Sequence, residues 1–181
     1  MASLPSKLQW VNGAFSRVTQ LIDGKKVVGE LKRELFSSDV IARLNDTTLR
    51  FDVRGFLKKQ VDVYDHNNTI IAVIELHMGR TATLHLNGET YIFKKNGFLS
   101  REWSLIHDLP DTEQDPEVIH YTAVRTFFKK EGELALLEPS PESDVLILTG
   151  LFLRNYVVRR QAKKAAVIGA ISEAIYFNKN H

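Results

Sequence analysis

Turn-forming dipeptides recur at regular intervals along this chain and limit the folds that it can adopt. Six of them separate short runs rich in β-branched and aromatic residues: Asp23-Gly24, Asn45-Asp46, Asn67-Asn68, Asn87-Gly88, Asn96-Gly97 and Glu131-Gly132. Asn and Gly adopt positive φ at little cost, as two-residue hairpin turns require. Because short turns connect neighbouring strands, the pattern predicts an antiparallel meander of about a dozen strands between residues 7 and 138.

So many short strands without intervening helices are typical of a sandwich or a closed barrel. We expect closure, because an open sheet of a dozen strands would leave long unpaired edges. About eight strands can fill a barrel with their own side chains, and a larger barrel must hold something else. The 181 residues show no shift in composition, so we expect one domain spanning residues 1–181.

The most apolar segment, residues 145–158, is the candidate for that interior. A helix-start signature, Ser-Pro-Glu at 140–142, precedes it, and its first part is apolar nearly all round. A membrane span needs about 20 apolar residues, whereas apolar runs of about 10–14 residues are usually core helices. We therefore predict a core helix over about residues 141–161 inside the barrel, and an extra helical tail over about 162–177.

This arrangement resembles the tubby-like superfamily, which includes tubby C-terminal domains, phospholipid scramblases and LURP-one-related proteins. The resemblance covers roughly residues 7–161. It rests on the strand-turn rhythm, on VYDHNNTIIAVIEL and LNGETYIFKKNGFLSREWSL, and on SDVLILTGLFLRN as the last helix. It implies a twelve-stranded antiparallel barrel around a central hydrophobic helix. Because tubby domains bind phosphoinositides and scramblase-like members associate with membranes, it also implies an anionic lipid as ligand. Residues 162–181 continue beyond the family's usual end.

Paired lysines are the candidate ligand-binding residues. Two pairs occur in a shared pattern, FKKNG containing Lys94 and Lys95, and FKKEG containing Lys129 and Lys130. If both patterns form hairpin tips at one end of the barrel, four ammonium groups could meet an anionic headgroup or another phosphate. The alternative is structural, because lysines at strand ends also prevent edge pairing and keep turns soluble.

The composition argues against several other functions. Lys and Arg number 24 against 22 Asp and Glu, so no global charge attracts nucleic acid, which is not an expected partner. The absence of cysteine excludes thiolate catalysis and thiolate metal ligands. No histidine pair has a metal-site spacing, and no nucleotide-binding or hydrolase motif occurs. We expect no metal, no cofactor and no enzymatic activity. The acid-rich loop at 107–117 leaves a small hydrolase as the weaker hypothesis.

Two functions therefore stay open. The first is a non-enzymatic binding module for anionic phospholipid headgroups or other phosphorylated ligands at the inner membrane surface. The second is a structural or protein-interaction domain in which the tail 162–177 contacts a partner or a second copy of the chain. Packing of the tail on its own barrel is the default expectation. Residues 1–10 contain no apolar run suited to a signal peptide, so a cytoplasmic location is expected.

Overall fold

The computed structural model describes residues 6–13, 16–35, 39–54, 60–77, 81–97, 100–110, 112, 114–125 and 129–179. Twelve strands precede one helix, α1 (Ser143–Lys179). The strands are β1 (Lys7–Gly13), β2 (Val18–Asp23), β3 (Lys26–Arg33), β4 (Val40–Leu44), β5 (Thr47–Arg54), β6 (Gln60–Tyr64), β7 (Ile70–Leu76), β8 (Thr81–Leu86), β9 (Glu89–Lys95), β10 (Glu102–Asp108), β11 (Glu117–Arg125) and β12 (Lys129–Leu136).

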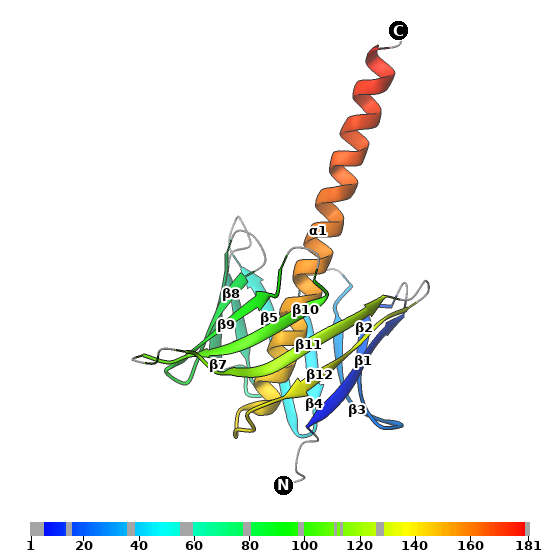
Figure 1. Cartoon of the computed structure of the whole chain (residues 1–181). Coiled ribbons are helices and arrows are strands. Elements are labelled where there is room, and N and C mark those ends of the chain that lie inside the picture. Colours follow the sequence, from blue (N-terminus) through cyan, green and yellow to red (C-terminus); the bar gives the residue numbers. More distant parts are fainter. Residues whose placement is uncertain are drawn as a thin grey trace.

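The strands form one closed antiparallel barrel (Figure 1). Each strand pairs with its neighbours in sequence, and β1 pairs with β12, which closes the sheet. The predicted barrel of about twelve strands around a hydrophobic helix is confirmed. Successive strands run in opposite directions. The last residues of the odd-numbered strands and the first residues of the even-numbered strands therefore lie at the same end of the barrel. Helix α1 emerges from that end, which we call the mouth (Figure 1).

The predicted turns are correct in five of the six places. The left-handed backbone falls on the expected residue types, with φ of 51° at Asn45, 51° at Asn87 and 85° at Gly88. The prediction for Glu131-Gly132 is wrong, because both residues lie inside β12. Gly132 pairs with Trp10 across the β1–β12 ladder, and this close packing, rather than a turn, requires a glycine there.

The first half of α1 fills the barrel. Its residues from Leu146 to Leu153 are essentially inaccessible to solvent, and the Phe152 ring stacks on Phe51 of β5 with centroids 4.2 Å apart. The helix starts slightly later than predicted, because residues 140–143 form a turn in which the Ser140 N–H donates to the Ser143 hydroxyl at 2.8 Å. An all-round apolar helix is stable only where every face is covered, and twelve strands supply that cover.

Tyr121 on β11 fixes the position of α1 along the barrel axis. Its hydroxyl donates to the backbone oxygens of Leu146 and Ile147, at 3.3 Å each. A Cβ at Gly150 would lie 2.0 Å from the Tyr121 hydroxyl, so only glycine lets the phenol approach the helix this closely. This contact places the next turn of α1, including Arg154, at the mouth.

The second half of α1 continues past the mouth and projects away from the barrel (Figure 1). The helix is unbroken through residue 161, so the tail predicted at 162–177 is its direct extension. Ala165, Ala166 and Val167 are exposed, and the default expectation that the tail packs on its own barrel is wrong for these residues. Within the part of the chain that the structure describes, no helix combines the length and apolarity needed to cross a bilayer.

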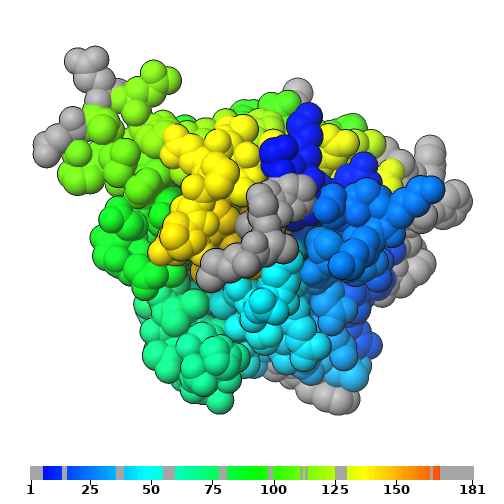
Figure 2. All heavy atoms as spheres, turned by 90° about the horizontal axis from the view of Figure 1, so that it is seen from below, coloured from blue at the N-terminus to red at the C-terminus, as the bar shows by residue number. Residues whose placement is uncertain are grey.

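The opposite end of the barrel, where α1 begins, is acidic. In Figure 2, which views this end, the segment between β12 and α1 (yellow) lies beside the β4–β5 hairpin (cyan). The Asn45 amide donates to the Asp144 carboxylate at 3.1 Å, which ties the start of the helix to that hairpin. Several acidic residues occur in the described connections at this end: Asp46, Asp65, Asp115, Glu138 and Glu142. The formal net charge is only +2, but acidic residues gather at this end of the barrel and cationic residues gather at the mouth.

Candidate anion-binding site at the barrel mouth

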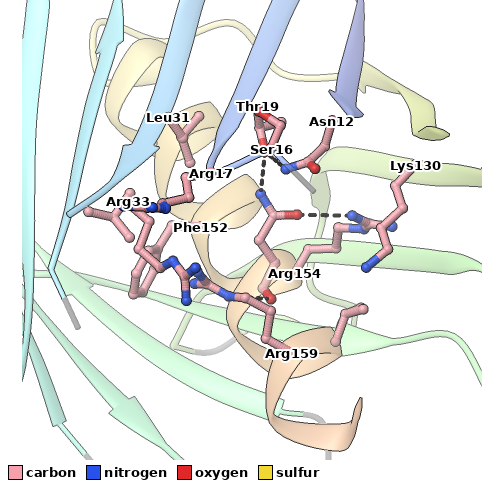
Figure 3. Close-up of a pocket in the computed structure, with 13 residues that line it drawn as sticks. Asn12, Ser16, Arg17, Thr19, Leu31, Arg33, Lys130, Phe152, Arg154 and Arg159 are labelled. Carbon is pink, nitrogen blue, oxygen red and sulfur yellow. Dashed lines mark hydrogen bonds between the residues drawn. The ribbon is translucent and has the colours of Figure 1, made fainter. Parts of the chain in front are cut away.

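A cavity of about 110 Å³ lies at the mouth, between α1 and the ends of β1, β2, β3 and β12. This is well above the ~10–15 Å³ needed to hold one water, so a small polyatomic ion has room. Among the described residues that line it, none is acidic and five are cationic (Figure 3). These five, which we call the mouth cations, are Arg17, Arg33, Lys130, Arg154 and Arg159.

Arg154 is held by a stack that begins at Gly132. A Cβ at Gly132 would lie 2.6 Å from Cζ2 of Trp10, so the missing side chain makes room for the indole. The Arg154 guanidinium carbon lies 3.9 Å from the centre of the Trp10 ring. A guanidinium over an indole face is attracted by the ring's negative π surface. Gly132 and Trp10 thus form the support on which the site's most buried charge rests.

Arg154 is a buried charge without a counter-ion among the residues that the structure describes. Its residue is 6% exposed, and its Nε is buried without a hydrogen-bond partner among the described atoms. Burial lowers the pKa of Arg154 to about 10, because a charged guanidinium is poorly stabilised away from water. Buried charges are usually paired, so a guanidinium that lines a cavity without a described carboxylate partner is a candidate contact for an anion.

Polar side chains hold the cavity's shape. Nη1 of Arg154 donates to Oδ1 of Asn155 at 2.9 Å, and Nδ2 of Asn155 donates to the Thr19 hydroxyl oxygen at 3.2 Å. The same hydroxyl oxygen accepts a bond from Nδ2 of Asn12 at 2.8 Å. This chain connects α1 to β1 and β2, so the guanidinium has a fixed orientation before any ligand arrives.

The remaining arginines crowd one another. Nε of Arg159 donates to the backbone oxygen of Asn155 at 3.2 Å, which holds that side chain against the helix. Burial lowers the pKa of Arg159, and the positive charge of Arg33 lowers it further. Arg33 in turn lies beside Arg17, since its N–H donates to the Arg17 carbonyl at 3.1 Å. Positive charges on neighbouring side chains repel each other, and a bound anion would relieve that repulsion.

No carboxylate of the described residues lies within 4.0 Å of a charged nitrogen of any mouth cation. The described ion pairs of Arg side chains are elsewhere, at Arg43 and Arg54. Guanidinium groups form strong, directed hydrogen bonds to phosphate and carboxylate oxygens. The chemistry that this arrangement supports is therefore reversible binding of an anion.

No family model, no curated protein and no solved structure matches this chain. No ligand or activity is therefore carried over from another protein, and the mouth cations are the observation on which a function can rest. Among the described residues, no group of three or more His, Asp or Glu side chains is placed to hold a metal ion.

The predicted lysines lie at the mouth end of the barrel, but the structure does not bring all of them to one place. Lys130 lines the cavity, whereas Lys94 is exposed and Lys95 lies 5.9 Å from the Trp103 ring centre on another part of the rim. The side chain of Lys129 lies outside the described residues.

The strand register shows how far apart these lysines are. Lys95 on β9 pairs with Trp103 on β10, which pairs with Tyr121 on β11, and Tyr121 pairs with Leu134 on β12. Leu134 is four residues from Lys130 along β12, so the two lysines differ by about 13 Å along the strands and by about 14 Å across them.

Sequence reasoning missed the four arginines of the site. Arg154 and Asn155 did leave a signal, since they interrupt an otherwise apolar segment. A charged residue inside a core helix needs a partner or a function. Arg17 and Arg33 gave no comparable signal, because arginines next to turns are common on any soluble surface.

Proposed function

We propose that this protein is a non-enzymatic binding module whose ligand carries phosphate and binds in the mouth cavity. One observation carries the proposal: five cationic side chains surround one cavity, and none has a described carboxylate partner. Arg154 gives the strongest support, because its buried guanidinium is held in place by Trp10 and Asn155, lines the cavity and has no described carboxylate partner. Phosphate is favoured over carboxylate because it offers more acceptor oxygens to converging guanidinium groups.

The ligand can be an anionic phospholipid headgroup or a soluble phosphorylated molecule. The orientation of the molecule supports the membrane setting, since α1 leaves the barrel beside the cavity and carries Arg160 and Lys163 on its exposed surface. Each such cation near an anionic bilayer contributes about 1 kcal/mol of attraction. A cytoplasmic protein that reaches the inner membrane surface with its mouth forward is consistent with both features.

A matched pair of lysine variants tests the cavity. In thermal melts at low ionic strength, inorganic phosphate should stabilise the wild type and Lys94→Gln equally, and it should stabilise Lys130→Gln less. Lys94 and Lys130 are both exposed lysines of the mouth end, but only Lys130 lines the cavity. Equal stabilisation of all three proteins by phosphate, or no stabilisation of any of them, would contradict the proposal.

Vesicle flotation then separates the two sources of phosphate. Vesicles of neutral lipid are compared with vesicles that contain an anionic phospholipid, at low salt, where charge attraction is strongest. Co-flotation that requires the anionic lipid and weakens in Lys130→Gln identifies a headgroup. Phosphate stabilisation without any flotation identifies a soluble ligand.

We also propose that the chain is a distant relative of the tubby-like superfamily. The support is the combination of twelve antiparallel strands in sequence order with an apolar final helix inside them. An experimental structure should superpose on a tubby C-terminal domain with all twelve strands and the helix in the same order. A different strand order in the superposition would contradict this kinship.

A protein-interaction role for the extension of α1 is the second candidate. The exposed side chains of Ala165, Ala166 and Val167, the last 59% accessible, favour it. Light scattering after size-exclusion chromatography should then show a larger assembly for the full chain than for a chain that ends at Lys164. Identical masses would count against self-association through this segment.

A further inference from the structure

The mouth cations fall into two groups on two sides of the cavity. Arg154 and Arg159 are five residues apart on the same helix, so they project in directions about 140° apart and are offset by about 7.5 Å along the axis. Figure 3 shows Arg154 with Lys130 on one side of the view and Arg159 with Arg17 and Arg33 on the other. We call these groups the lysine side and the arginine side.

The β1–β12 ladder places the two members of the lysine side next to each other. The ring of Trp10 supports the Arg154 guanidinium, and Lys130 is paired with Asn12, two residues beyond Trp10 on β1. Two residues along a strand correspond to about 7 Å, and residues two apart point to the same face. Lys130 therefore extends over the same inner surface of the barrel, one step closer to solvent than Arg154.

The arginine side is linked by backbone pairing and by electrostatics. Arg17 and Arg33 are neighbours across the β2–β3 ladder, and the charge of Arg33 acts on Arg159. Asn155 connects the two sides, because its amide oxygen accepts from Arg154 and its backbone oxygen accepts from Arg159.

The charge and size of the cavity restrict its ligand. One phosphate group carries a charge of about −1.5 to −2 at neutral pH, which offsets at most two of the five cations. Two phosphate groups offset about three charges and can reach both sides. A cavity of about 110 Å³ favours two adjacent phosphates with a shared bridging oxygen over phosphates held apart on a larger body.

We propose that the ligand carries a diphosphate group, with one phosphate held by Lys130 and Arg154 and the other by Arg17, Arg33 and Arg159. This inference rests on the proposed function, since it assumes that the cavity binds phosphate. It adds that two sides of the site act together on two linked phosphates. No bond is made or broken, and Asn155 connects Arg154 of one side to Arg159 of the other.

Calorimetric titration of the full chain tests the two-sided site. Pyrophosphate, phosphate and citrate are titrated at one low ionic strength into the wild type, Arg17→Gln, Lys130→Gln and the control Lys94→Gln. Arg17 and Lys130 are exposed, so neither substitution removes core packing, and thermal melts without ligand verify folding. Citrate matches pyrophosphate in approximate charge but not in geometry.

Pyrophosphate should bind the wild type at least about tenfold more tightly than phosphate or citrate, because hydrogen bonds to charged groups contribute about a factor of ten or more. Both Arg17→Gln and Lys130→Gln should weaken pyrophosphate severalfold, whereas only Lys130→Gln should weaken phosphate. Lys94→Gln should match the wild type. The inference is overturned if citrate equals pyrophosphate, or if only one of the two sides affects pyrophosphate. Absence of binding by all three anions would instead overturn the proposed function itself.

The same titration identifies what carries the diphosphate. A nucleoside diphosphate in solution and a prenyl diphosphate in neutral vesicles are compared with pyrophosphate. Tighter binding of either one supports the inference and names its carrier. Weaker binding of both supports free pyrophosphate as the ligand.

Discussion

Replacing Arg154 by methionine should make the ligand-free protein more stable and abolish its response to phosphate. Burial lowers the pKa of Arg154 from its ordinary value to about 10, and each pKa unit corresponds to about 1.36 kcal/mol, so the charge costs the folded state about 3 kcal/mol. The stacking on Trp10 and the hydrogen bond to Asn155 offset about 2 kcal/mol of this burial cost. Methionine fills similar space without charge, so we expect a net gain of about 1 kcal/mol.

The assay is urea denaturation at pH 7 in phosphate-free buffer. Since the folded-state pKa lies below the unfolded-state value, the charge destabilises the folded protein at every pH below about 10, and pH 7 measures the whole effect. For a chain of this size, 1 kcal/mol corresponds to a rise in melting temperature of about 2–4 °C. Arg43→Met is the matched control, because Arg43 is an exposed arginine and its change should alter stability by less than about 0.5 kcal/mol.

The order of stabilities should reverse when phosphate is added. Wild type gains stability by binding the anion, whereas Arg154→Met does not. If Arg154→Met is instead less stable than wild type by more than about 1 kcal/mol without phosphate, the guanidinium is compensated in the free protein. The reasoning that makes it a ligand contact would then be refuted.

Three further predictions concern the barrel. Gly132→Ala should destabilise the protein by more than 1 kcal/mol in urea titrations, because the new Cβ would lie 1.9 Å from the backbone oxygen of Thr122, which cannot rotate away; a neutral effect would contradict the packing described. Burial raises the pKa of Tyr121, so the folded protein should lose stability as the pH rises above about 10, the unfolded value. Between pH 9 and pH 11 the wild type should lose about 1.4 kcal/mol more than Tyr121→Phe, and equal losses would show that this hydroxyl ionises in the folded state. Leu148→Ala should cost about 2–5 kcal/mol and Val167→Ala less than about 0.5 kcal/mol, since the first lies inside the barrel and the second is exposed; similar costs would argue against the helix as core.

The fold was predictable because its determinants are local. Asn45, Asn87 and Gly88 adopt the positive φ that their residue types allow at low cost, and each fixes a hairpin without help from distant parts of the chain. The core helix was predictable from length and apolarity, because a segment too short to cross a bilayer has to be covered by protein. Gly132 shows the limit of this reasoning. Its role depends on Trp10, which is more than a hundred residues away, and a glycine beside Glu131 looks like a turn.

The candidate site was only partly predictable because it is assembled from six separate elements, α1, β1, β2, β3, β4 and β12. Lys130 was predicted together with Lys94 and Lys95, but identical residue types in similar short patterns lie on different parts of the rim. What distinguishes them is strand register, which no local pattern contains. Arg154 was visible in the sequence as an interruption of the core helix, yet its meaning required the position of α1 relative to the mouth.

A crystal structure grown with tungstate, a heavy analogue of phosphate, would test the central claim most directly. The anomalous signal should lie in the mouth cavity, with tungstate oxygens within hydrogen-bond distance of Arg154 and Lys130. Tungstate bound elsewhere on the surface, with only water between Arg154 and Arg159, would contradict the account.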